Sequence, residues 1–269
     1  MNRYEAMFSR VKAKGEGAFI PFAMLGDPDP ETSFAIIQAM IEGGADGLEL
    51  GMPFSDPVAD GPTIQLAAQR ALAHGFENPQ ASLDLVRRVR VANPQIPIGL
   101  LTYANLAFHA GIAQFYQNCA AAGVDSVLLA DVPVCEGAAF SEAAITAGID
   151  PVFIAPPNAN AQQLDGLARL GRGYSYVVTR YGVTGAQQSL QLQHDQLLQA
   201  LKQRNAPPPV MGFGISNRDA VRAAIRSGAA GAISGSALVQ IIERHLADRD
   251  TLIPAIRSAV ADLKAGTRD

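Results

Sequence analysis

Two acidic residues, Glu49 and Asp60, stand at either end of one predicted strand-to-helix connection. A loop rich in proline, aspartate and glycine separates them, and a helix is expected to begin near Pro62. Because strand side chains alternate between faces, Glu49 shares its face with Gly47 and Gly51. The glycines leave room around the carboxyl, and apolar surroundings would raise its pKa and suit it to proton transfer. The competing interpretation makes Glu49 an exposed strand-end charge and Asp60 an ordinary turn residue.

The elements that must position these acids follow a repeated order. Short apolar runs alternate with helical stretches eight times, which predicts a single (β/α)8 barrel domain over residues 1–269. A doubly wound open sheet is the alternative. An amphipathic helix over Arg3–Lys12 precedes the first strand and is expected to cover the bottom of the barrel. The predicted strands are Ala18–Met24, Asp46–Leu50, Ile96–Leu101, Ser126–Leu129, Pro151–Ile154, Tyr174–Val178, Val210–Gly212 and Ala230–Ser234.

Composition limits the possible partners and the setting. The chain has 269 residues and a net charge of -4. It has no run of Lys or Arg, which argues against nucleic acid or an anionic membrane as partner. No apolar stretch approaches the ~20 residues of a membrane span, and no signal peptide is recognised. Cys119 and Cys135 are expected to be reduced and packed in helices, which predicts a cytoplasmic protein.

Glycines at the last strand exits predict a phosphate site. Barrels often bind phosphate in the loops after strands seven and eight, where glycine lets the backbone approach an anion and a helix N-terminus offers N–H groups. Gly214, Gly235 and Ser236 occupy those positions, and Gly185 arrives from the sixth loop. Arg180 could also meet a phosphate or form a structural ion pair.

The residues that are missing narrow the chemistry further. The chain has four lysines and none follows a predicted strand, which argues against a Schiff-base aldolase or a pyridoxal-phosphate enzyme. The four histidines are scattered without ligand spacing, so no metal site is predicted. Two carboxylates and a phosphate site remain, with an expected apolar lining of Phe22, Leu101, Leu128, Ile154, Tyr176 and Phe213.

Six segments together resemble the α subunit of tryptophan synthase. They read LELGMPFSDPVADGPTIQ, GLLTYANL, DSVLLADVP, RYGVTG, GFGIS and GAAGAISGSA, in order along nearly the whole chain. The resemblance implies a (β/α)8 barrel that cleaves indole-3-glycerol phosphate to indole and glyceraldehyde 3-phosphate without a cofactor.

The resemblance also implies a role for each matching position. Glu49 would move protons and Asp60 would hold the indole nitrogen. Thr184 would position the aspartate when a lid closes, roughly over Ala186–Gln193. The phosphate would be bound by Gly185, Gly214, Gly235 and Ser236, and the indole pocket would comprise Phe22, Leu101, Tyr103, Leu128 and Tyr176.

The family implies a partner as well. It works as an α2β2 complex in which indole passes to a β subunit that uses pyridoxal phosphate, so that cofactor would belong to the partner. Three alternatives stay open: a stand-alone indole-releasing lyase, a sugar-phosphate isomerase or epimerase barrel, and a noncatalytic activator of a β subunit. The matching contact candidates are Pro53, Asp56, Pro57, Asn105 and Phe108.

Overall fold

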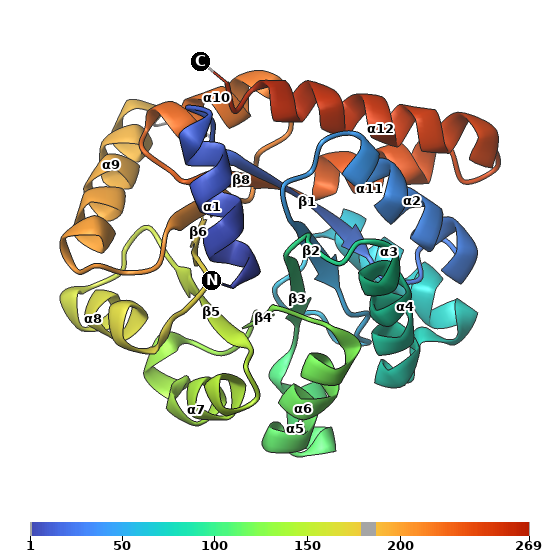
Figure 1. Ribbon diagram of the computed structural model, residues 1–269, viewed down its shortest axis with the longest axis horizontal. Coiled ribbons are helices and arrows are strands. Elements are labelled where there is room, and N and C mark those ends of the chain that lie inside the picture. The colour runs from blue at the N-terminus through green and yellow to red at the C-terminus, as the bar shows by residue number, and fades with distance from the viewer. Residues whose placement is uncertain (1, 179–186, 269) are drawn as a thin grey trace.

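The computed structural model describes residues 2–178 and 187–268, except for the side chains of residues 187–194. Eight parallel strands follow one another around a closed barrel, and β8 pairs with β1 to complete it. Helices surround the strands (Figure 1). The predicted (β/α)8 barrel is therefore confirmed. The strands are β1 (Ala18–Met24), β2 (Leu48–Gly51), β3 (Ile98–Thr102), β4 (Ser126–Leu129), β5 (Asp150–Ala155), β6 (Ser175–Val178), β7 (Pro209–Gly212) and β8 (Gly231–Ser234).

Short polar residues begin many of the helices. The Asp29 carboxylate accepts the N–H groups of Glu31 and Thr32, and the Asn217 side chain accepts the N–H of Ala220. Such caps satisfy donors that a first turn leaves free. The helices are α1 (Arg3–Ala13), α2 (Pro30–Glu42), α3 (Pro62–Ala71), α4 (Pro79–Ala92), α5 (Ala104–Ala110), α6 (Ile112–Ala122), α7 (Ala138–Thr146), α8 (Ala161–Leu170), α9 (Gln187–Gln203), α10 (Arg218–Arg226), α11 (Ser236–Arg244) and α12 (Arg249–Ala265), with a π-helix at Leu72–Phe76 and a 3-10 helix at Val134–Glu136.

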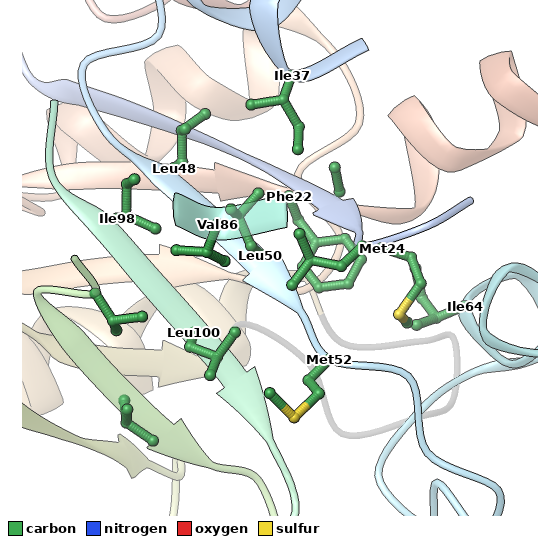
Figure 2. Packing of buried hydrophobic residues seen from close by; sticks show 14 of the residues in the cluster. Phe22, Met24, Ile37, Leu48, Leu50, Met52, Ile64, Val86, Ile98 and Leu100 are labelled. Atoms are coloured by element: carbon green, nitrogen blue, oxygen red, sulfur yellow. The ribbon is translucent and has the colours of Figure 1, made fainter. Parts of the chain in front are cut away.

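Two apolar layers hold the barrel together. The outer layer lies between the strands and the helices, and it includes Leu48 and Leu50 of β2, which pack near Ile37 and Ile98 (Figure 2). The inner layer fills the barrel and includes aromatic and aliphatic side chains from several strands. Because Leu48 and Leu50 face outward, Glu49 between them faces inward, as the alternation of the strand predicts.

The N-terminal end of the barrel is covered and cross-linked by charge. Helix α1 lies across this end (Figure 1), with Met7 and Val11 buried. The Lys264 ammonium near the end of α12 is 2.9 Å from a Glu16 carboxylate oxygen and 2.8 Å from one of Asp46. Lys264 is itself buried, so this cluster joins the last helix to the segments that lead into β1 and β2.

The structure bears on three further expectations, which concern the two cysteines, the expected lid segment and membrane-spanning helices. Cys119 is buried in α6, but Cys135 is exposed in the 3-10 helix, so the expected helix packing is wrong for the second cysteine. Of the segment expected to act as a lid, Ala186 lies outside the described residues and the remainder belongs to α9, so its role as a lid stays a prediction. Among the helices within the described ranges, none is long and apolar enough to cross a membrane.

Candidate active site

A cavity of about 240 Å³ opens where the strands end and the loops toward the helices begin. Barrels of this type carry their chemistry at this face, because several loops converge there on a rigid frame. The lining combines two carboxylates with apolar and glycine-rich segments. Residues predicted for the site that line it are Phe22, Glu49, Asp60, Leu101, Tyr176, Phe213, Gly214, Gly235 and Ser236.

Glu49 is a buried carboxyl that accepts a hydrogen bond from a buried tyrosine. It lies on β2, level with Phe22 of β1 and Gly99 of β3, and only 2% of it is exposed. The Tyr174 hydroxyl donates a hydrogen bond of 3.0 Å to its Oε1. Burial raises the pKa of Glu49 to about 8, and the Asp60 charge acts in the same direction, while the Tyr174 hydrogen bond opposes both. Glu49 is therefore largely protonated at neutral pH and can both give and take a proton.

This buried carboxyl predicts a pH-dependent cost in stability. The unfolded chain loses the Glu49 proton near its ordinary pKa of 4.5, whereas the folded chain retains it until about pH 8. Folding therefore favours the protonated form, and stability is lost as pH rises between these values. We expect Glu49→Gln to be more stable than the wild type above pH 8, by several kcal/mol at ~1.4 kcal/mol per pKa unit. The two proteins should become similar near pH 4.5.

Urea unfolding of both proteins at pH 5, 7 and 9 measures this difference. Because all other titrating groups are shared, their contributions cancel in the comparison of the two proteins at each pH. A stability difference that stays constant with pH would contradict the raised pKa of Glu49.

Asp60 enters the cavity from the loop between β2 and α3. Burial raises the pKa of Asp60, and the Tyr103 hydroxyl beside its carboxylate opposes that rise. The same hydroxyl accepts the Ala59 N–H at 3.3 Å, and the Tyr103 ring stacks on Phe54 at a centroid distance of 5.2 Å. The Gln65 side chain donates to the Asp60 carbonyl at 2.8 Å. Asp60 is thus fixed through both its side chain and its backbone.

Aromatic rings form much of the apolar wall. Tyr176 and Phe213 meet edge to face with centroids 6.0 Å apart. Glycine makes room for the rings: a Cβ on Gly212 would lie 2.2 Å from the Tyr176 hydroxyl, and one on Gly51 would lie 2.7 Å from the Phe22 ring. A flat aromatic ligand could therefore lie against this wall beside the two acids.

The glycine-rich part of the cavity lining is suited to an anion. Phe213 and Gly214 both have positive φ, at 61° and 81°, which turns the backbone sharply there. Helix α11 begins at Ser236 behind Gly235, and no described side chain caps it, so its first N–H groups are available to a ligand. The Ser234 hydroxyl donates to the Ile215 carbonyl at 2.7 Å and joins the two glycine-rich turns.

The described lining includes no Lys or Arg, so an anion here would depend on backbone N–H groups and the Ser236 hydroxyl. Within the described ranges, no cluster of three or more His, Cys, Asp or Glu side chains is placed to hold a metal ion.

Comparison with known proteins decides the family. The family model for the tryptophan synthase alpha chain matches residues 8–268. The chain belongs to the tryptophan synthase alpha-chain family. It is 53% identical over 268 residues to the tryptophan synthase alpha chain of Escherichia coli (strain SMS-3-5 / SECEC), with 100% of both chains covered. Identity to the corresponding protein of Klebsiella pneumoniae subsp. pneumoniae is 54%, covering 100% of this chain and 99% of that protein.

Solved alpha chains share the fold. The structure of tryptophan synthase subunit alpha from Legionella pneumophila str. Paris has a TM-score of 0.89 at 29% identity, covering 99% of this chain and 98% of that chain. A Mycobacterium tuberculosis tryptophan synthase structure has a TM-score of 0.88 at 28% identity, covering 100% and 99%.

Membership in the tryptophan synthase alpha-chain family confirms the resemblance and the lyase function predicted with it. It removes the sugar-phosphate isomerase or epimerase and the noncatalytic activator as leading alternatives.

Several residues predicted for the alpha-chain site lie away from the cavity lining or outside the described ranges. Leu128 and Ile154 lie in or against the apolar cluster inside the barrel, and Tyr103 is buried behind Asp60. Thr184, Gly185 and Arg180 are outside the described residues, so their roles stay predictions.

Some residues of the site were not predicted from the sequence. Tyr174 precedes Tyr176 by two positions, so strand alternation would have placed both side chains inward. Ile64 is the third residue of α3, which the helix start at Pro62 could have brought to the site. Further lining residues that were not predicted are Gly61, Ile215, Ser216, Ile233 and Ala237.

Proposed function

We propose that Glu49 and Asp60 cleave indole-3-glycerol phosphate to indole and glyceraldehyde 3-phosphate without a cofactor. The observation that carries this proposal is the Glu49 carboxyl, which is buried, has a pKa of about 8, and shares one cavity with Asp60. A C–C bond to an indole ring breaks only if the ring carbon can accept the bonding electrons. Protonation of that carbon provides this, and Glu49 is protonated at neutral pH.

Substrate binding follows from the glycine-rich and the aromatic parts of the cavity lining. The phosphate binds at the N-terminus of α11, with Gly214, Gly235 and Ser236 around it. The indole ring lies against the apolar wall that includes Phe22 and Tyr176. Because the phosphate is held away from the reacting bond, its binding energy orients the substrate without contacting the atoms that change.

The proton transfers balance over one cycle. Glu49 gives its proton to C3 of the indole ring, and the Asp60 carboxylate stabilises the positive charge at the ring N–H. Glu49, now a carboxylate, takes the proton of the adjacent glycerol hydroxyl, the C–C bond breaks, and its electrons restore the aromatic ring. The hydroxyl oxygen becomes the aldehyde oxygen. One proton has moved from that hydroxyl to C3, and Glu49 is protonated again.

We further infer how the chain assembles. The alpha-chain name implies a beta-chain partner, and we propose an α2β2 complex in which the beta chain alone uses pyridoxal phosphate. Of the predicted contact residues, Asp56, Asn105 and Phe108 are exposed, Pro57 is partly exposed and Pro53 is buried. The three exposed residues would form the contact together with Val58, which was not predicted and is also exposed. We also propose that residues 1–269 form a single domain and that the protein is cytoplasmic. In the proposed site Thr184 positions Asp60 and Gly185 binds the phosphate.

The test is indole release by the purified chain from indole-3-glycerol phosphate, alone and with added beta chain. We expect indole and glyceraldehyde 3-phosphate in equal amounts and faster turnover with the beta chain. Gel filtration of the mixture should show one larger species. No indole under either condition would overturn the proposed reaction. Full turnover without any association would support a stand-alone lyase instead.

A further inference from the structure

Tyr4 on α1 reaches from the covered end of the barrel into its interior. Only 2% of this residue is exposed, and its hydroxyl is 2.8 Å from the Ser126 Oγ at the start of β4. Gly99 of β3 makes room for this contact, because a Cβ there would lie 2.9 Å from both oxygens. The Tyr4 side chain is therefore hydrogen-bonded to β4 and accommodated by β3, although it belongs to a helix outside the barrel.

Tyr4 contacts the residue that holds Glu49. The rings of Tyr4 and Tyr174 pack with centroids 5.4 Å apart at an interplanar angle of 52°. The Tyr174 hydroxyl donates to Glu49 Oε1 at 3.0 Å. These three side chains are all buried, so a continuous path of contacts runs from the N-terminal helix to the carboxyl.

We propose that Tyr4 is a positioning residue for Glu49 and acts by supporting the Tyr174 ring. The Tyr174 hydroxyl keeps its hydrogen bond to Glu49 only while the Tyr174 ring is held in place by its neighbours. The Tyr4 ring is one of these neighbours. Helix α1 then does more than cover the barrel, because it helps to fix the orientation and charge state of the proton carrier. The inference rests on the proposed function only where activity is the readout.

Several ionisable groups near Glu49, Tyr174 and Tyr4 affect the pKa values that a titration would measure. Glu49 is influenced by Asp60, and Tyr174 and Tyr176 lie within electrostatic reach of it. Burial raises the pKa of Tyr4, and the charges of Asp125 and Asp150 at the base of the barrel act in the same direction. The Asp125 carboxylate is paired with Arg3 at 2.7 Å and with Arg90 at 2.5 Å. The Asp60 charge raises the pKa of Glu49. The Tyr174 hydrogen bond is the contact that lowers the pKa and that Tyr4 can change.

The test compares Tyr4→Leu, Tyr174→Phe and the double variant. Glu49 enters the reaction protonated, so kcat/KM should fall above its pKa, and loss of the Tyr174 hydrogen bond should move this fall to higher pH. We expect an upward shift of about one pH unit for Tyr174→Phe, since a hydrogen bond to a charged group is worth that order. Tyr4→Leu should shift it by at least ~0.5 unit in the same direction, with little further shift in the double variant.

Two controls separate positioning from general loss of structure. Met7→Ala removes a buried side chain one turn further along α1, so it should lower the melting temperature but leave the pH profile unchanged. Tyr4→Phe keeps the ring and loses only the hydroxyl, so it should nearly preserve the profile, and it remains informative if Tyr4→Leu does not fold. Reduced stability with an unmoved profile in Tyr4→Leu, a downward shift, or fully additive shifts would overturn the proposal.

A readout without turnover distinguishes this inference from the proposed function. Carboxyl 13C NMR of protein labelled at glutamate follows the pKa of Glu49 directly, and Glu49→Gln identifies its signal. We expect the pKa of Glu49 to rise in Tyr4→Leu and Tyr174→Phe. If it rises while the kinetic profile does not move, Glu49 is not the proton carrier, but Tyr4 still positions it. An unchanged pKa in Tyr4→Leu would overturn the positioning role itself.

Discussion

Glu49→Gln is expected to release indole ~10²–10⁴ times more slowly than the wild type, the range in which general acid–base groups contribute. Glutamine has nearly the same size and can still accept the Tyr174 hydrogen bond, but it neither gives nor takes a proton at neutral pH. Glu49 serves both proton transfers in the proposed cycle, so its loss stops both. The other acid in the described lining is Asp60, which cannot take over because it is engaged at the ring nitrogen. The loss should persist when the beta chain is present.

The measurement is single-turnover indole formation with saturating substrate, which separates the chemical step from binding. Glu42→Gln provides a matched control, since Glu42 is an exposed acid at the end of α2 that pairs with Arg257. This control should retain full turnover. A Glu49→Gln protein with unimpaired turnover would rule out Glu49 as the proton carrier.

Asp60→Asn is expected to lower turnover by ~10²–10³-fold with little change in substrate affinity. The amide keeps the shape of the side chain but cannot offset the positive charge that develops on the indole nitrogen, and removal of one such preorganised group costs about this much. Substrate should still bind, because the change leaves intact the aromatic wall and the glycine-rich lining that is proposed to bind the phosphate.

Substrate affinity and turnover must therefore be measured separately for Asp60→Asn. Equilibrium binding of indolepropanol phosphate reports affinity, because this analogue lacks the hydroxyl next to the indole ring and cannot be cleaved. Single-turnover kinetics report the chemical step. Asp84→Asn, an exposed acid on α4, serves as the matched control. A protein that no longer binds the analogue would instead assign Asp60 a structural role in the loop.

The barrel itself was readable from the sequence because its signals are local. Short apolar runs followed by helices that often end on glycine are repeated eight times, and each strand boundary was predicted within about two residues. The inward direction of Glu49 followed from the two-residue period of a strand alone. The motifs of the family then implied roles for the two acids and for the glycines that are predicted to bind phosphate.

Other parts of the site depend on contacts between distant segments. Tyr103 was expected to line the indole pocket, but its ring stacks on Phe54 and its hydroxyl lies beside Asp60, which requires knowing how the loop folds back. The placement of Ile64 depends on the rotation of α3 about its axis. The support of Glu49 by Tyr174 could have been found by counting strand positions, whereas the contact with Tyr4 joins segments about 170 residues apart in sequence, beyond any local pattern.

The Lys264 cluster has a consequence for the order in which the protein can be made. Lys264 lies near the end of α12, far along the chain from Glu16 before β1 and Asp46 before β2, yet its ammonium is a buried counter-ion of both carboxylates. During synthesis both carboxylates exist long before that cation does. The charge pairs that tie the segments before β1 and β2 to α12 can therefore form only after α12 has been synthesised.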